Sequence, residues 1–183
     1  MNDLFASLRI CVATMLVCVV GYTAVVLGFA WSCAPAAAAG SLLRTADGTV
    51  VGSRLLAQAF AQPRFFWPRP SAVDWNAAAA GGSNLSPSNP ALAERARRAI
   101  ERFGATAANP LPADLATTSG SGLDPHISLA AASFQVPRVA AARGLPAATV
   151  QAVVERLAFR PGPFAAGERL VNVLELNLEL ERR

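Results

Sequence analysis

Hydrophobic and polar positions divide the chain into one long apolar segment and a mixed remainder. The apolar segment, Ile10 to Trp31, reads ICVATMLVCVVGYTAVVLGFAW and carries no charge. At ~1.5 Å per residue, a helix of this length crosses the ~30 Å hydrocarbon core of a bilayer. The pattern predicts a transmembrane helix over residues 10–31, between an N-terminal segment (1–9) and a linker (32–40). A cleaved signal peptide is the alternative, although its apolar region would span only roughly 7–15 residues.

Helical periodicity recurs in the remainder, residues 41–183. The clearest case is residues 90–103, where Asn89 can cap the helix, Pro90 suits its first position and Gly104 can close it in a left-handed conformation. Its apolar stripe comprises Leu92, Ala96, Ala99, Ile100 and Phe103.

Further helices are predicted from Ser128 to Gly144 and from Pro146 to about Phe159, with Val150, Val153, Val154 and Leu157 facing inward in the latter. Pro137 should kink or shorten the helix that contains it, because proline lacks the backbone donor. A short helix is expected over residues 53–60.

Two patterns indicate strands. Asp47 and Gly48 lie between apolar runs and predict a hairpin with a turn of the primed kind. In the segment 171–181, Leu174, Leu176, Leu178 and Leu180 alternate with polar residues, which predicts a terminal strand with one buried face. The expected fold class is therefore α+β: one N-terminal transmembrane helix followed by a single mixed helix/sheet domain.

Residues 62–90 are rich in proline, glycine, serine and asparagine, which favours turns over regular ladders. The same segment contains Phe65, Phe66, Trp67 and Trp75. Disordered linkers are poor in aromatic residues, so we predict an ordered, packed loop.

Composition narrows the function. All 16 basic residues are arginine, and the missing lysine excludes a P-loop ATPase and lysine Schiff-base chemistry. The net charge is only +4, and the cluster of Arg95, Arg97, Arg98 and Arg102 is interpreted as a solvated helix face. We therefore expect no nucleic-acid partner.

The basic residues nearest the apolar segment suggest its orientation. Arg9 precedes it closely, whereas the first arginine after it is Arg44. The positive-inside rule then predicts a cytoplasmic N-terminus and an extracytoplasmic body, which is periplasmic if the segment spans a Gram-negative inner membrane. All three cysteines, Cys11, Cys18 and Cys33, precede the body, and no cysteine pair suggests a metal site.

The stretch SGSGLDPHIS, Ser119 to Ser128, contains the only histidine. A serine hydrolase would need His126 beside a serine nucleophile such as Ser119 or Ser121, but no GxSxG pattern is present. The Asp124-Pro125-His126 turn should direct its two polar side chains apart. We favour a rigid loop, in which Gly120 and Gly122 permit positive φ and Ser128 caps a helix, and keep the membrane-anchored hydrolase as the alternative.

A second glycine-rich stretch, AGGSNLSPSNP from Ala80 to Pro90, could bring backbone amides near an anion. It lacks lysine and the strand-to-helix spacing of dinucleotide sites, so a structural loop is favoured. No recognisable cofactor motif results.

Taken together, several segments resemble one family. They are Gly52, Ser53, Leu55, Gln58 and Phe60, then RPSAVDWN (69–76), GGSNLSPSNP (81–90), SGSGLDPHIS (119–128) and VNVLELNLEL (171–180). In this order after a membrane helix, they resemble the KdpC family, the C subunits of the Kdp high-affinity potassium-transporting P-type ATPase.

The resemblance implies an accessory, noncatalytic subunit that assembles with a potassium-channel-like subunit and a P-type ATPase subunit. It also implies a catalytic chaperone that raises the ATP affinity of the ATPase subunit, so ATP enters at the level of the complex. An extracytoplasmic body conflicts with direct ATP contact, and none of the five aspartates begins a DKTG motif.

Two sets of residues are expected to carry this function. Small residues on one face of the membrane helix would let a partner helix approach: Gly21, Ala24 and Gly28. The structural or interaction loops would be formed by Arg69, Pro70, Ser71, Asn76, Gly81, Gly82, Ser83, Asn84, Ser119, Gly120, Ser121, Gly122, Asp124, Pro125 and His126.

Overall fold

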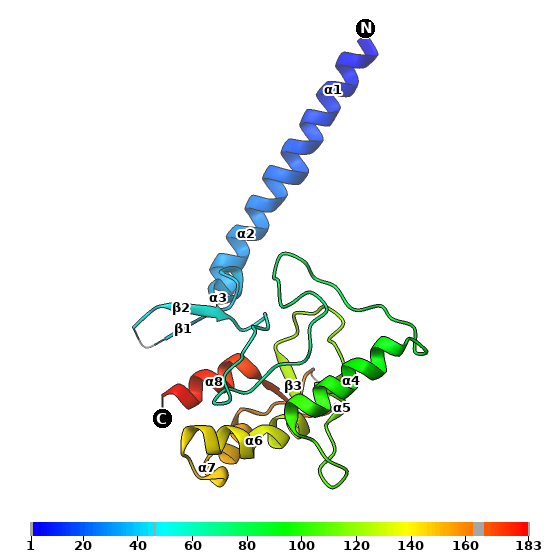
Figure 1. The fold of residues 1–183 in the computed structure, drawn as a ribbon. Coiled ribbons are helices and arrows are strands. Elements are labelled where there is room, and N and C mark those ends of the chain that lie inside the picture. The colour runs from blue at the N-terminus through cyan, green and yellow to red at the C-terminus, as the bar shows by residue number, and fades with distance from the viewer. Residues whose placement is uncertain (1, 46, 163–166, 183) are drawn as a thin grey trace. The chain divides into compact units, whose positions relative to one another are not determined.

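The fold is taken from a computed structural model, which describes residues 2–45, 47–162 and 167–182. The chain forms two compact units, Met1–Leu42 and Leu43–Arg183, which are described separately. Figure 1 labels most of their elements.

The first unit is a continuous helical rod. It consists of α1 (Asn2–Met15), the π-helical turns η1 (Leu16–Gly21) and α2 (Tyr22–Cys33), followed by the single turn α3 (Pro35–Ala38). Asn2–Cys33 is 32 residues long with a mean hydropathy of 2.5, so its length and composition suffice to cross a membrane. None of its side chains is buried within the chain.

The second unit begins with a hairpin, as predicted, formed by β1 (Leu42–Arg44) and β2 (Val50–Ser53). Its turn starts one residue earlier than expected, because Gly48 N–H donates to the Thr45 carbonyl at 3.0 Å. Gly48 thus follows the turn with φ +85°, as in three-residue hairpin loops, and is not at the centre of a primed turn.

The predicted helix over residues 53–60 is wrong. A turn at residues 54–56 is followed by chain without helix or strand. Ala57 N–H donates to the Leu123 carbonyl at 2.8 Å, so a distant loop supplies the partner that a helix would have supplied locally.

Helix α4 (Pro90–Phe103) confirms the clearest prediction. Asn89 Oδ1 accepts from Ala91 N–H at 2.9 Å, and Gly104 closes the helix with φ +65°. Of the predicted stripe, Ala99 is buried, but Ile100 is 44% exposed.

The short α5 (Ala113–Ala116) precedes β3 (His126–Ser128), after which Ser128 caps α6 (Leu129–Arg143). Ser128 Oγ accepts from Ala131 N–H at 3.0 Å, as predicted. Pro137 does not shorten α6. Helix α7 (Ala147–Leu157) also matches its prediction, with Val150, Val153 and Val154 buried.

The predicted terminal strand is wrong. Only β4 (Leu170–Asn172) is extended, and it pairs antiparallel with β3, Ile127 opposite Val171. Helix α8 (Val173–Glu181) follows immediately, capped by Asn172 Oδ1, which accepts from Glu175 N–H at 3.1 Å. Val173, Leu176, Asn177 and Leu180 are buried at helical spacing.

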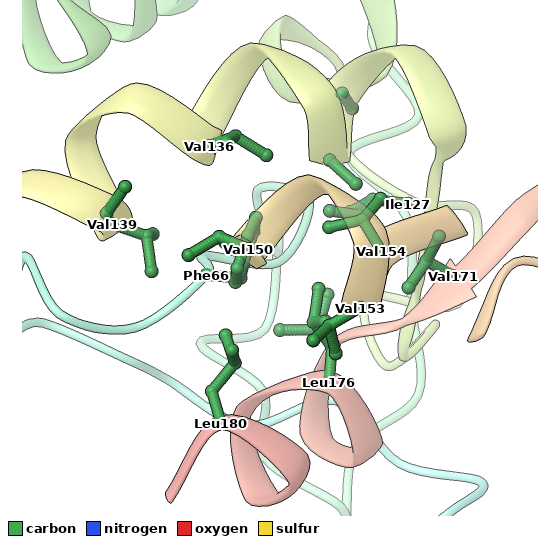
Figure 2. Packing of buried hydrophobic residues seen from close by; sticks show 14 of the residues in the cluster. Phe66, Ile127, Val136, Val139, Val150, Val153, Val154, Val171, Leu176 and Leu180 are labelled. Atoms are coloured by element: carbon green, nitrogen blue, oxygen red, sulfur yellow. The ribbon is translucent and has the colours of Figure 1, made fainter. Parts of the chain in front are cut away.

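The core lies between α6, α7 and α8, with the β3–β4 pair along one side (Figure 2). Val136 and Val139 from α6 face Val150 of α7, and Leu176 and Leu180 close the cluster from α8. Phe66, which comes from the long loop, is fully buried among them, so the predicted packing of that loop is confirmed. Helices with two small, separate sheets make the fold α+β.

Candidate interaction site

Three of the singled-out segments meet at one junction, formed by residues 69–76, 81–84 and 117–126. Its centre is the Ser71 hydroxyl, which donates to the Gly122 carbonyl at 2.7 Å. The same oxygen accepts from the N–H groups of Val73 at 3.1 Å and Trp75 at 3.0 Å. One hydroxyl therefore fixes both its own turn and a loop some fifty residues away in sequence.

Gly122 is the position where the junction admits no side chain. Its φ is +70°, and a Cβ there would lie 2.6 Å from Val73 Cγ2 and 2.8 Å from the Gly81 carbonyl oxygen. Gly120 differs from the prediction, because its φ is not positive and a Cβ would meet nothing within 4 Å. Only Gly122 of this pair needs to be glycine for conformational reasons.

Backbone hydrogen bonds join the three segments. Gly81 N–H donates to the Ser121 carbonyl at 2.7 Å, and Ser119 N–H donates to the Pro70 carbonyl at 3.2 Å. At Gly82 a Cβ would lie 2.9 Å from the Gly120 carbonyl oxygen. These single backbone hydrogen bonds hold the three segments together without regular strand pairing.

The two asparagines of the predicted set lie at its edge. Asn76 and Asn84 are both exposed, and Asn76 Oδ1 accepts only from the nearby Ala78 N–H, at 3.0 Å. Ser83 lies further in, where its hydroxyl accepts from Thr118 Oγ1 at 3.3 Å and from Arg95 at 3.4 Å.

The side chains of Asp124 and His126 face each other, contrary to the prediction. Asp124 Oδ1 lies 3.0 Å from His126 Nδ1 and accepts from His126 N–H at 3.0 Å, while Arg69 lies 3.7 Å from Asp124 Oδ2. The turn at Pro125 folds the aspartate back over the following backbone, as aspartates do in Asx turns. Burial raises the pKa of Asp124, but the hydrogen bonds and charge of His126 and the charge of Arg69 outweigh it, leaving the pKa below its ordinary value.

This pair lacks a nucleophile. Ser121 Oγ accepts from Leu123 N–H, and Ser128 Oγ caps α6 while donating to Asp114 Oδ1 at 3.2 Å. Across the described residues, no serine hydroxyl is hydrogen-bonded to His126, which packs edge-on against Phe159. A serine hydrolase requires that contact. No group of three His, Cys, Asp or Glu side chains in this part of the chain could hold a metal ion.

Two buried amides anchor the long loop beside the junction. Asn177 Oδ1 accepts from Phe66 N–H at 2.8 Å, and Asn177 Nδ2 donates to the Phe66 carbonyl at 3.0 Å. Gln135 does the same for the next residue, Trp67, at 2.8 and 3.1 Å. Side chains from α8 and α6 thus pair with the loop as neighbouring strands would.

Two arginine side chains lie over the ring of Trp67, which no sequence pattern indicated. The guanidinium groups of Arg102 and Arg138 lie over its indole, at 4.3 and 3.7 Å from the ring centroid. Burial and the charge of Arg102 lower the pKa of Arg138 to about 10, so it remains protonated at neutral pH. The predicted solvated face of α4 is confirmed for Arg97, Arg98 and Arg102, which are exposed, although Arg102 also lies over Trp67; it is wrong for the half-buried Arg95.

Comparison with known proteins decides between the two interpretations of the sequence. The family model for the K+-transporting ATPase, c chain, matches residues 4–182. A potassium-transporting ATPase KdpC subunit of Parvibaculum lavamentivorans is 57% identical, over 100% of this chain and 97% of its own. A KdpC subunit of Pseudomonas aeruginosa is 46% identical over 97% of both chains, and one of a Caulobacter species is 49% identical over 88% and 84%. The chain belongs to the KdpC family.

Membership makes this chain a KdpC subunit of a potassium-transporting ATPase and leaves the hydrolase without support. In this KdpC chain, the stretch SGSGLDPHIS supplies one wall of the junction, the start of β3 and the cap of α6. Its histidine-aspartate pair orders a turn. No sequence pattern indicated Asp114, yet its carboxylate accepts from both the backbone and the hydroxyl of Ser128.

The small residues of the apolar N-terminal helix of this KdpC chain have few neighbours. A Cβ at Gly28 would meet nothing within 4 Å, and one at Gly21 would approach only the Leu16 carbonyl oxygen, at 3.5 Å. No contact within the rod therefore requires glycine at these two positions.

Proposed function

We propose that this KdpC chain is an accessory, noncatalytic subunit that assembles and stabilises the potassium-channel-like and P-type ATPase subunits. In this proposal its N-terminal helix spans the inner membrane with the N-terminus in the cytoplasm, and the body lies in the periplasm. The apolar rod Asn2–Cys33 is the observation that carries the proposal, because its side chains find no cover within the chain. Lipid and partner helices would supply that cover.

The membrane helix is the first assembly element in this proposal. Gly21, Ala24 and Gly28 recur at intervals of three and four, which lets a partner backbone approach along one helical face. Gly21→Leu combined with Gly28→Leu should reduce co-purification of the complex. Val19→Leu combined with Val26→Leu is the control, because it adds bulk without removing a small residue. Equal recovery of both variants would contradict this role for the helix.

The side of the membrane on which the body lies determines whether this chain can contact ATP directly. With the body in the periplasm, the family's effect on ATP affinity would have to pass through the partner subunits. We expect the KM for ATP to rise when the complex lacks this chain, and we expect the isolated full chain not to bind nucleotide. Reporter fusions after Arg183 test the orientation directly. Fluorescence of a reporter that folds only in the cytoplasm would overturn it and restore direct ATP contact.

A further inference from the structure

A groove of about 170 Å³ runs beside α4, next to the junction. Its apolar wall includes Trp67, Trp75 and Phe103, and its polar rim is formed by Arg95, Arg98 and Arg102. Trp67 is only 8% exposed and Leu115, at the bottom, is fully buried. The apolar wall is therefore recessed behind a rim of guanidinium groups.

The charges of this rim are not balanced by nearby carboxylates. Arg95 donates to the hydroxyls of Ser83 and Thr118 at 3.4 and 3.3 Å, and Arg102 to the Phe60 carbonyl at 3.5 Å. Among the described carboxylates, only Glu94 pairs with the rim, through Arg98 at 2.9 Å. Because only neutral oxygens accept from them, the half-buried Arg95 and the exposed Arg102 keep unneutralised positive charges.

Several arginines elsewhere on the body form ion pairs with carboxylates. Arg54 pairs with Glu175 at 2.6 Å, Arg143 with Glu181 at 2.8 Å and Arg169 with Glu155 at 2.7 Å. Behind the groove, Arg138 adds another positive charge and donates to the Pro63 and Phe65 carbonyls and to Gln135. The groove is thus a local concentration of positive charge, whereas several arginines elsewhere on the body pair with carboxylates.

We propose that this groove receives a segment of a partner protein in which an apolar or aromatic side chain lies next to a carboxylate. The carboxylate would take charge-assisted hydrogen bonds from Arg95 and Arg102, and the apolar side chain would pack against Trp75 and Phe103. The proposal rests on the assembly role given above and adds where on the body a partner binds and what chemistry that partner offers.

Size and shape favour a protein segment over other anions. Drug-sized ligands and cofactors occupy pockets of roughly 300–1,000 Å³, whereas this groove has room for one or two side chains. A membrane surface would have to reach a recessed tryptophan, which a flat layer of headgroups cannot do. Clusters of Trp, Tyr and Arg in such settings are typical of binding hot spots.

The first test compares charge-neutral variants of the full chain. Arg95→Gln combined with Arg102→Gln removes the rim charge, and Arg97→Gln on the same helix is the control, because Arg97 is exposed and does not line the groove. Each variant is titrated in detergent with partner subunits purified from cells that lack this chain. We expect the double variant to bind at least about tenfold more weakly and with less dependence on salt, as for loss of a charged contact. The control should bind like the wild type.

Folding of the double variant is checked by its melting temperature, because Arg102 also stacks on Trp67. Arg95→Lys combined with Arg102→Lys keeps the charges and should recover part of the affinity. A photo-crosslinking amino acid at position 98 should label a partner peptide that contains an acidic residue, whereas the same group at position 97 should not.

Wild-type affinity and salt dependence in a folded double variant would overturn the groove proposal while leaving the assembly role intact. Failure of the wild-type chain itself to bind the partner subunits would overturn the assembly role. Vesicles of phosphatidylcholine with phosphatidylglycerol test the lipid alternative. Loss of vesicle binding in the double variant, with subunit binding unchanged, would assign the groove to lipid and overturn our proposal.

Discussion

The body contains two regions that are held together by different means. The helical core consists of α6, α7 and α8 with the β3–β4 pair, and its backbone groups find partners nearby in sequence or in one short ladder. The loop region, residues 54–89, has neither helix nor strand, and Figure 1 shows it as a long winding trace from cyan to green. Its backbone depends on side chains and carbonyls from distant segments.

This difference predicts which single substitutions should lower the free energy of unfolding most. In the helical core, one lost methyl group leaves a cavity that the neighbours partly fill. In the loop region, one lost amide leaves buried backbone groups without hydrogen-bond partners. One added Cβ overlaps atoms of a neighbouring segment. The contacts that hold the loop region should therefore be more sensitive than the helical core to a few polar and glycine positions.

The largest effect is expected at Gly122, where the loops meet. Gly122→Val combines a positive φ with overlap against Val73 and the Gly81 carbonyl, and should cost about 3–5 kcal/mol in unfolding free energy. Gly120→Ala is the control and should cost less than about 1 kcal/mol. Denaturation of the full chain in detergent measures both. Similar losses of unfolding free energy in the two variants would contradict the claim that only Gly122 must be glycine.

The next effect is expected at Asn177, which links the two regions. Asn177→Ala leaves the buried N–H and C=O of Phe66 without partners and should cost about 2–4 kcal/mol. Gln62→Ala removes an exposed amide from the same loop and serves as the control. Limited proteolysis should cut the Asn177→Ala variant near Phe66 first. Preferential cleavage in α6 or α7 would show that the helical core is the weaker region.

A smaller effect is expected at Ser128, inside the helical core. Ser128→Ala removes the cap of α6 and a contact with Asp114, at a cost of about 1–2 kcal/mol. Ser121→Ala, which loses one local hydrogen bond at the surface, should cost about 0.5 kcal/mol. Thermal denaturation gives the ordering, and the reverse order would make the Ser121 hydroxyl more important than the Ser128 cap.

The smallest effect concerns Asp124 and depends on pH. Because the pKa of Asp124 is lowered in the folded chain, its stabilisation is complete above the unfolded value of about 3.9 and is lost as pH falls through the folded value. Asp124→Asn should cost on the order of 1 kcal/mol at pH 7, since the side chain is 35% exposed and partly screened. The cost should disappear in acid. Asp74→Asn, at an exposed aspartate, is the matched control.

Sequence patterns predicted the helical core better than the loop region, for a physical reason. Caps and periodicity are local, so Asn89, Ser128 and Gly104 were placed correctly. The terminal strand failed because alternating leucines also satisfy part of a helical stripe. Asn172 with Glu175 is the N-cap pattern that could have distinguished them, since it begins a helix rather than extending a strand.

The loop contacts could not be predicted from local patterns. Ser71 and Gly122 lie in separate motifs, and nothing in either motif states that the two residues touch. The groove was missed for the same reason: the sequence pattern of α4 does not show that Arg102 lies over the indole of Trp67, which Arg138 also covers. Family resemblance supplied the identity of the chain without supplying these contacts.

The amide of Asn177 also sets an order of events during biosynthesis. It is 111 residues from Phe66 in sequence, and it lies in α8. A ribosome delivers residues 54–89 long before α8, so the backbone of Phe66 waits for this hydrogen-bond partner until α8 has been made. Trp67, which lines the groove, directly follows Phe66. A partner that recognises the groove would therefore favour chains in which α8 has already folded.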